Sequence, residues 1–437
     1  MNVRHKALGW LKRRQAQRNV ASYIEPELRT LVVFASQSGF AETIAWRTAE
    51  ALRAGGKPAR LISLGAVTPR DLAARDLLFV VSTTGKGDAP DSARGFVRLM
   101  RAKPPDLSQA RYALAALGDS SYEHFCAFGD KLDAWLRAAG AQPAAEMIRV
   151  DNGDNGALES WRASAARFGA LAASDVWRGS SFRRCRLVKR TWLNPGSPGA
   201  PLFHLALAPV EGPLDWAAGD IAEIFPGPAG DVFLDASAAH RDYSLASIPA
   251  DASLEIVVRQ MRFADGALGI ASRWLTEECE IGDPVALRIR ENKAFHAPPA
   301  DAPMILIGNG SGIAGIRAHL RARQISGARP NWLLFGERTR QHDFHFADEI
   351  GRWREEGTLA RIDLAFSRDG AARTYVQHLL LQAGDEVRAW LADGAAVYLC
   401  GAATGMAEGV EAALKEILGP EGFAEWAESG LYRRDVY

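Results

Sequence analysis

The chain has 437 residues, which is too long for one ordinary hydrophobic core and predicts two or three folding units. Its 52 basic residues balance its 52 acidic residues, so the composition argues against a nucleic-acid-binding protein and leaves local patches as surfaces for a charged partner. The four cysteines, Cys126, Cys185, Cys279 and Cys400, show neither CxxC spacing nor a disulfide framework, which favours a reducing compartment.

Apolar runs stay shorter than the roughly 20 residues that cross a bilayer, and the N-terminus lacks the apolar stretch of a secretory signal. We therefore expect a cytoplasmic protein. Residues 1–30 form a basic N-terminal tail with scattered apolar positions. A solvated tail is the favoured interpretation, and a short amphipathic helix near anionic lipid or a partner is the alternative.

Residues 31–173 alternate short apolar runs with helical patterns. The runs LVVFAS, LLFVVST and YALAALG each precede a stretch of helical periodicity, which predicts a doubly wound α/β domain with helices on both faces of a parallel sheet. Ligands of such sheets bind at the carboxyl ends of the strands, and three unusual loops follow these three runs.

A short polar linker is expected at residues 174–181. Residues 182–299 are rich in short strand patterns separated by Gly and Pro turns, which predicts an antiparallel β-barrel. In residues 300–437 the strand-then-helix order returns, and we expect a second α/β domain. The predicted architecture is therefore α/β, β-barrel and α/β.

The first loop, Ser36–Glu42, brings hydroxyl groups, a glycine and free backbone N–H groups to the positive end of a predicted helix, where a phosphate can bind. An ordinary N-cap at Ser38, with Glu42 in the first turn, explains this segment alone equally well. The loops 82–88 and 117–125 decide between the two, because their glycines admit a flat ligand and Tyr122 offers a stacking face.

Together the three loops resemble the flavodoxin family, in which such loops bind FMN. The resemblance implies phosphate ligands at Ser36, Gln37, Ser38, Gly39 and Ala41, ring contacts at Thr83, Thr84 and Gly85, a third loop with Gly118, Tyr122 and Phe125 in which Tyr122 stacks on the ring, and an acidic edge at Asp151. Many relatives carry an aromatic where this chain has Thr84, so the flavin ring is expected to be stacked on one face, as in sulfite reductase flavoproteins.

In the barrel segment, Arg241–Ser244 place an arginine, a ring and a hydroxyl on one predicted strand. Arg241 suits a pyrophosphate, Tyr243 an isoalloxazine face, and Ser244 the flavin N5 that receives hydride. A half-exposed edge strand is the alternative for this motif alone. A second pyrophosphate cradle is predicted at the start of a helix, formed by Gly269, Ile270, Ala271 and Ser272.

These two motifs resemble the ferredoxin-NADP reductase family and imply an FAD site. A flavodoxin-like domain followed by such a reductase is the order found in diflavin reductases, including the sulfite reductase flavoprotein subunit and NADPH-cytochrome reductases. Those relatives insert a connecting domain before the RxYS strand, whereas here only residues 226–240 separate Phe225 from Arg241. The missing connecting domain leaves the arrangement of the two flavin domains open.

A glycine-rich loop, Gly308–Gly315, follows an apolar strand and precedes a helix, which predicts a pyrophosphate cradle at Gly310, Ser311 and Gly312. Glu337, at the end of the next strand, is available as the ribose ligand of an NAD-type site. The reductase family offers the better match, although it usually has proline where this chain has Gly315.

A later run resembles the family's SRxxxxKxYxQ pattern and implies a site for the adenosine 2′-phosphate of NADPH, with Arg338 as a weaker phosphate ligand. Its predicted ligands are Ser367, Arg368, Arg373, Tyr375 and Gln377. A solvated loop that carries two arginines is the alternative.

Cys400 matches the cysteine that lies near the nicotinamide in the family, where we expect it to position groups and not to act as a nucleophile. At the C-terminus, Asp435 matches an acidic residue that steadies the transferring hydride, and Tyr437 matches an aromatic that covers the flavin. With Ser244 these residues form the predicted catalytic set. No metal site is predicted.

The resemblance implies an NADPH-dependent diflavin oxidoreductase that passes hydride from NADPH to FAD, then single electrons through FMN to a haem or iron-containing acceptor. A haem protein, a sulfite reductase haem subunit or a ferric-siderophore system fits as the partner, and so does a peripheral membrane protein. The alternatives are a single-flavin NADPH reductase with a degenerate FMN domain and a flavin-carrying interaction module without nucleotide turnover.

Overall fold

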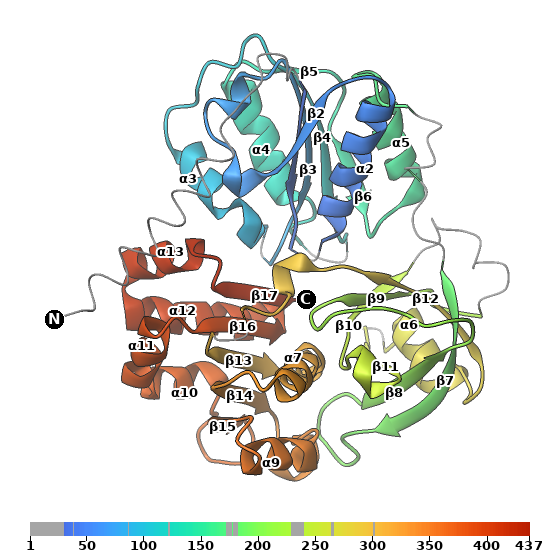
Figure 1. Ribbon diagram of the computed structural model, residues 1–437, viewed down its shortest axis with the longest axis vertical. Helices are drawn as coiled ribbons and strands as arrows, with labels where there is room; N and C mark the ends of the chain where they lie inside the picture. Colours follow the sequence, from blue (N-terminus) through green and yellow to red (C-terminus); the bar gives the residue numbers. More distant parts are fainter. Residues whose placement is uncertain are drawn as a thin grey trace.

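The computed structural model describes residues 30–37, 39–85, 87–120, 123–171, 177, 182–228, 240–263, 266–299 and 302–437. Figure 1 shows three bodies of secondary structure in chain order, which we name the N-terminal, central and C-terminal domains after their three sheets. The basic tail up to residue 29, the predicted FMN ligands Ser38 and Tyr122, and the linker apart from Trp177 lie outside the described residues.

The N-terminal domain contains a parallel sheet in the order β2-β1-β3-β4-β5, with β6 also paired to β4. Its elements are β1 (Thr30–Ala35), α2 (Phe40–Ala54), β2 (Ala59–Ser63), β3 (Asp76–Ser82), α3 (Arg94–Arg101), β4 (Arg111–Gly118), α4 (Ala127–Ala138), β5 (Gln142–Pro143), β6 (Ile148–Asp151) and α5 (Asn155–Ala166). The apolar runs are buried on both faces, against α3 and α4 on one side and α2 and α5 on the other. The predicted α/β arrangement is confirmed.

The central domain contains an antiparallel sheet in the order β10-β9-β12-β7-β8-β11. Its strands are β7 (Arg183–Trp192), β8 (Leu202–Pro209), β9 (Ile221–Ile224), β10 (Arg241–Ser244), β11 (Leu254–Arg259) and β12 (Pro284–Arg290), and α6 (Ile270–Arg273) follows β11. The edge strands meet at a single bridge between Leu245 and Ile256. The structure therefore confirms an antiparallel sheet, and its closure into the predicted barrel depends on that one bridge.

The C-terminal domain contains a parallel sheet in the order β15-β14-β13-β16-β17. Its strands are β13 (Met304–Asn309), β14 (Asn331–Glu337), β15 (Arg361–Phe366), β16 (Ala396–Gly401) and β17 (Tyr432–Val436), and its helices are α7 (Ile313–Ser326), α8 (Arg340–Asp343), α9 (Ala347–Glu355), α10 (Val376–Gln382), α11 (Gly384–Ala392), α12 (Glu408–Leu418) and α13 (Pro420–Glu428). The final strand was not predicted, and it pairs Asp435 with Cys400. Across the described parts of the chain, none of the helices combines the length and apolar character needed to span a membrane.

The N-terminal domain stands directly on the edge of the C-terminal domain that carries β17 (Figure 1). The Gln37 side chain donates to the Arg434 carbonyl at 2.7 Å, and Arg434 Nε donates to Asp91 Oδ2 at 2.6 Å. Further ion pairs join Arg94 to Glu411 and Arg98 to Glu428 across the same boundary. Charged and polar contacts therefore join the N-terminal domain to the C-terminal domain.

The Arg434–Asp91 pair gives a test of this docking. Although burial raises the pKa of Asp91, the charges of Arg434 and Arg94 lower it below its ordinary value, so the pair stabilises docking at neutral pH. Because a hydrogen bond between charged groups contributes about 1.5–3 kcal/mol, Arg434→Gln should weaken docking roughly 10- to 100-fold. In small-angle scattering, the radius of gyration of the variant should increase at a lower salt concentration than that of the parent protein.

Arg388→Gln is the matched control, because Arg388 pairs with the exposed Asp385 inside the C-terminal domain. Identical salt dependence for the two variants would contradict a docking role for Arg434.

Candidate functional site

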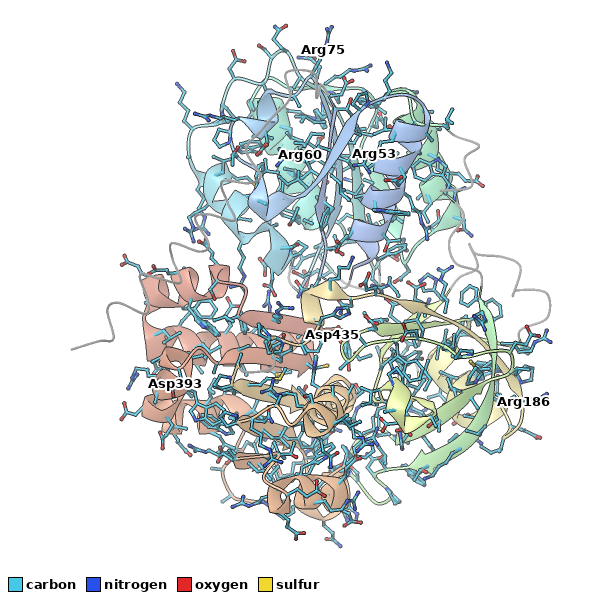
Figure 2. All side chains as sticks on the ribbon, in the orientation of Figure 1. Arg53, Arg60, Arg75, Arg186, Asp393 and Asp435 are labelled. Atoms are coloured by element: carbon cyan, nitrogen blue, oxygen red, sulfur yellow. The ribbon has the colours of Figure 1, made fainter. Side chains whose placement is uncertain are left out.

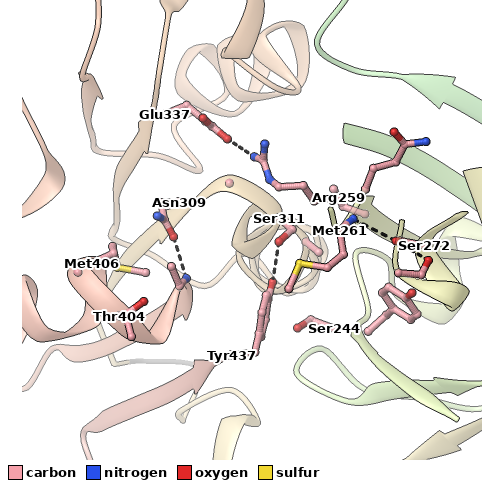
Figure 3. Close-up of a pocket in the computed structure, with 18 of the residues that line it drawn as sticks. Ser244, Arg259, Met261, Ser272, Asn309, Ser311, Glu337, Thr404, Met406 and Tyr437 are labelled. Carbon is pink, nitrogen blue, oxygen red and sulfur yellow. Dashed lines mark hydrogen bonds and ion pairs between the residues drawn. The ribbon is translucent and has the colours of Figure 1, made fainter. Parts of the chain in front are cut away.

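A cavity of about 1280 Å³ lies where the three domains meet (Figure 3). It exceeds the roughly 300–1,000 Å³ of ordinary small-molecule pockets and has room for extended ligands. Predicted site residues that line it are Asp151, Arg241, Tyr243, Ser244, Gly269, Ile270, Ala271, Ser272, Gly310, Ser311, Ser367, Tyr375, Gln377 and Tyr437. The fold thus brings residues predicted for three different cofactors to one cavity.

Ser244, which lines this cavity, meets two further predicted catalytic residues that are buried, Asp435 and Cys400. Ser244 Oγ donates to Asp435 Oδ2 at 2.6 Å, and Cys400 Sγ lies 3.8 Å from the same oxygen. Pairing of β17 with β16 sets Asp435 beside Cys400, and β10 presents Ser244 from the central domain. Figure 2 shows Asp435 in the middle of the molecule, near the junction of the domains.

Tyr437 stands over the same corner (Figure 3). Its hydroxyl donates to Ser311 Oγ at 3.3 Å, and its main-chain N–H donates to the Gly401 carbonyl at 3.1 Å. Half of the tyrosine surface is exposed, at 50%. Because the main chain of Tyr437 carries the pairing with the sheet and its hydroxyl makes a long hydrogen bond, the ring can rotate without disturbing the sheet.

Burial decides the protonation behaviour of this corner. It raises the pKa of the Asp435 carboxyl above its ordinary value, while the hydrogen bond from Ser244 and the charge of Arg290 oppose that shift. Burial also raises the pKa of the Cys400 thiol well above its ordinary value, so the sulfur is a neutral thiol near neutral pH. The geometry and charge state suit a positioning role for Cys400.

The glycine-rich loop after β13 is packed too closely for side chains. A Cβ on Gly312 would lie 2.0 Å from the Cys400 carbonyl oxygen, and one on Gly315 would lie 3.0 Å from its sulfur. Gly310 has a φ of +56°, in the left-handed region that glycine tolerates best. Asn309 accepts a hydrogen bond from Ala402 N–H at 3.0 Å and joins this loop to the end of β16.

An ion pair that sequence reasoning missed lies beside this loop. Arg259, the last residue of β11, pairs with Glu337 at the end of β14, and both line the cavity (Figure 3). Although burial raises the pKa of Glu337, its contacts with His345 and Arg259 hold it below the ordinary value. Glu337, the alternative NAD-type ribose ligand, is therefore paired with the guanidinium of Arg259. In the sequence, the pattern LEIVVR indicates a strand that ends at Arg259 and gives no sign of this partner.

The predicted 2′-phosphate site is divided. Ser367, Tyr375 and Gln377 line the cavity, whereas Arg368 and Arg373 are exposed and do not belong to its lining. The three uncharged residues of the predicted set therefore lie together at the cavity. The two arginines remain predicted ligands.

The predicted FMN loops meet at the carboxyl edge of the first sheet. Gly39, with a φ of +85°, precedes α2, and Ala41 is buried in its first turn. Ser36 exchanges two hydrogen bonds of 3.0 Å with Ser92 Oγ. The Gln37 side chain donates hydrogen bonds to Asp91 and to the Arg434 carbonyl. A phosphate in this loop would therefore bind the main chain of Gln37 and not its side chain.

The second and third loops are shaped by hydrogen bonds within the domain. Thr83 Oγ1 accepts from Phe128 N–H at 3.2 Å, Thr84 pairs with Asp88 through the main chain, and Gly85 turns with a φ of +51°. Asp151 accepts from Ser120 N–H at 2.9 Å and so anchors the third loop.

Gly118 and Phe125 contact each other closely. A Cβ on Gly118 would lie 2.9 Å from the Phe125 ring. Ser38 of the first loop and Tyr122 of the third loop lie outside the described residues.

Comparisons with known proteins agree with this organisation. Residues 32–163 match the flavodoxin family, and residues 306–412 match the oxidoreductase NAD-binding domain family. A sulfite reductase [NADPH] flavoprotein alpha-component from Thiocapsa roseopersicina is 31% identical over 447 residues, covering 89% of this chain and 84% of the relative. The chain belongs to the diflavin reductase family.

Two more distant relatives carry the same name. The alpha-components from Vibrio cholerae and Bacillus subtilis are each 26% identical, over 537 and 540 residues, and cover 93% of this chain and 87% and 89% of the relatives. Both alignments are longer than the 437-residue chain, so these relatives contain segments that it lacks. This difference agrees with the missing connecting domain.

The protein is accordingly an NADPH-dependent flavoprotein reductase whose cofactors are FMN, FAD and NADPH. The described residues fit these groups. A glycine precedes α2, where a phosphate suits the helix end, and Gly310 and Ser311 line a cavity larger than one small ligand needs. Ser244 and Asp435 form a buried polar pair that suits a reacting flavin edge.

The raised pKa of Asp435 predicts the pH dependence of flavin reduction. The carboxylate loses its charge as the pH falls through its pKa, which lies above the ordinary aspartate value of about 3.9. The rate of flavin bleaching after anaerobic mixing with NADPH should therefore decline at a higher pH than an ordinary aspartate would cause. Asp435→Asn should remove this acid limb, and Asp393→Asn, at an exposed position, should keep it. An acid limb that persists in Asp435→Asn would rule out this assignment.

Proposed function

We propose that the protein transfers hydride from NADPH to FAD and then passes single electrons through FMN to a haem or iron-containing redox protein. The observation that supports this best is the single cavity lined by all three domains, with Asp151 from the first, Tyr243 from the second and Gly310 from the third. One continuous cavity allows the cofactors of neighbouring domains to approach one another, and proximity is the main contribution a protein makes to such chemistry.

Within this proposal the flavins supply hydride acceptance and single-electron transfer, and the protein supplies orientation and electrostatics. Ser244 is oriented by its hydrogen bond to Asp435, and its hydroxyl faces the predicted flavin edge. Asp435 provides a buried negative charge that steadies positive charge on the nicotinamide side. Tyr437 covers the corner, excludes water while nucleotide is absent, and moves aside for it.

The acceptor is proposed from the relatives, whose printed names describe a flavoprotein component of sulfite reductase. A haem subunit is therefore the first acceptor to test, followed by other haem proteins and ferric-siderophore systems. The FMN loops face the other domains when docked, so we propose that the N-terminal domain undocks to meet its partner. A cytoplasmic location is part of this proposal, supported by four buried cysteines that form no disulfide.

Flavin quantification combined with anaerobic NADPH titration tests the proposal. We expect one FAD and one FMN per chain, and bleaching of both flavins by NADPH. One flavin per chain would favour the single-flavin reductase, and two flavins that NADPH does not bleach would favour an interaction module. Acceptor reduction rates for the haem and ferric candidates then rank the partners.

Removal of the terminal ring tests the gating role of Tyr437. Tyr437→Ser should let either nicotinamide stack on the flavin, so the NADPH-to-NADH ratio of kcat/KM should fall roughly tenfold, which corresponds to 1.4 kcal/mol. Tyr437→Phe, which keeps the ring and loses only the bond to Ser311, is the control and should retain the ratio. An unchanged ratio in the serine variant would disprove the gating role.

The two exposed arginines of the predicted 2′-phosphate run give a second kinetic test. Arg368→Ala should lower kcat/KM for NADPH roughly 10- to 100-fold and leave NADH nearly unchanged, because a charged hydrogen bond to phosphate contributes about 1.5–3 kcal/mol. Arg354→Ala, at an exposed position of α9, is the control and should affect neither nucleotide. Equal losses with both nucleotides would instead indicate an NAD-type site.

A further inference from the structure

Arg290 is a buried arginine that the catalytic proposal does not use. It ends β12 in the central domain, and only 6% of its surface is exposed. Its Nε donates to Glu223 Oε1 at 2.6 Å, and Nη2 pairs with Asp242. Among the described residues, its third nitrogen, Nη1, has no hydrogen-bond partner. Leaving a buried N–H of a charged group without a hydrogen bond costs free energy, so we expect this nitrogen to have an acceptor in the loaded protein.

The unpaired nitrogen faces the N-terminal domain. Nη1 lies 3.6 Å from the point where a Cβ on Gly39 would stand, and the guanidinium carbon lies 6.0 Å from the centre of the Phe40 ring. The main chain that follows Arg290 is closer still, with the Glu291 carbonyl oxygen 2.8 Å from the same point. Arg290 therefore reaches across the domain boundary to the loop that opens α2.

That loop has the properties of a phosphate site. Helix α2 has 15 residues, and its N-cap Gly39 offers no side chain to satisfy the first N–H groups. Those groups and the helix dipole attract an anion. The loop belongs to the domain matched to the flavodoxin family, whose cofactor carries a terminal phosphate.

The charges around Arg290 leave room for one more anion. Arg288 also pairs with Glu223, so this carboxylate keeps a cationic partner when Arg290 engages another group. A phosphate monoester brings about 1.5–2 negative charges and several acceptor oxygens, and a guanidinium matches its geometry.

We propose that Arg290 donates through Nη1 to the 5′-phosphate of FMN at the N-terminus of α2 when the two domains are docked. The phosphate would then have ligands from two domains. This inference rests on the proposed FMN site and deepens it. Because Arg290 reaches the phosphate only in the docked arrangement, FMN binding and domain docking favour each other reciprocally.

The test compares FMN with riboflavin, which lacks the phosphate, in the full-length FAD-loaded protein. Arg290→Met should weaken FMN binding roughly 10- to 100-fold and leave riboflavin binding unchanged, and Arg290→Lys should restore part of the FMN affinity. Arg288→Met is the matched control, because it removes a neighbouring charge from the same carboxylate. Dissociation constants come from the fluorescence of released flavin, and retained FAD reports that the variant is folded.

Equal weakening of FMN and riboflavin in Arg290→Met, or unchanged affinity for both, would overturn the inference. If Arg290→Met loses FAD, Arg434→Gln provides the second measurement, since undocking should lower the affinity for FMN and not for riboflavin. An Arg434→Gln protein that retains full FMN affinity would also overturn it. If the parent protein does not bind FMN, the proposed function itself is wrong. If the parent protein binds FMN and the affinity does not depend on Arg290, only this inference is wrong.

Discussion

The parallel pairing of β17 with β16 is the contact on which the site depends. Successive residues of a strand point to opposite faces, so Arg434 and Asp435 serve two different surfaces. Asp435 faces inward and accepts the hydrogen bond from Ser244, while Arg434 reaches Asp91 of the N-terminal domain. A five-residue strand thus joins the Ser244–Asp435 pair to the contact surface of the N-terminal domain.

The contacts between the N-terminal and C-terminal domains bear on how the two flavin domains are held together. The hydrogen bonds and ion pairs described at this boundary join charged and polar side chains, including Arg434 to Asp91 and Arg98 to Glu428. Charged pairs near the surface are weakened by salt and by competing charges, unlike a large apolar interface. Such contacts suit the proposed function, in which the N-terminal domain docks to receive electrons and separates to deliver them.

Much of the fold was predictable from the sequence, because buried parallel strands are continuous apolar runs and their loops carry distinctive glycines. The strand β17 was missed, since its sequence YRRDV has three charged residues and no apolar alternation. Its burial comes from neighbours distant in the chain, such as Asp91 for Arg434, which are 343 residues apart. The Arg259–Glu337 pair was missed for the same reason.

Many of the residues that the motifs single out line the cavity, but the motifs do not reveal the hydrogen-bond partners of these side chains. Gln37 shows the difference. The motif implies a phosphate ligand, and the structure instead bonds its side chain to Asp91 and to the Arg434 carbonyl. A local motif cannot reveal that another domain engages the same side chain.

The proposed turnover involves two motions, rotation of the Tyr437 ring and undocking of the N-terminal domain, and the hydrogen bonds around β17 allow them to be separate. The main chain of Tyr437 is fixed at both ends, through its N–H to Gly401 and through its carbonyl from Ala403 N–H. Its hydroxyl donates a long hydrogen bond of 3.3 Å to Ser311. Rotation of the ring for nicotinamide therefore leaves the strand, and with it the Arg434 contacts, in place. Arrival of hydride need not undock the FMN domain, so both flavins can be reduced before the domain leaves for its partner.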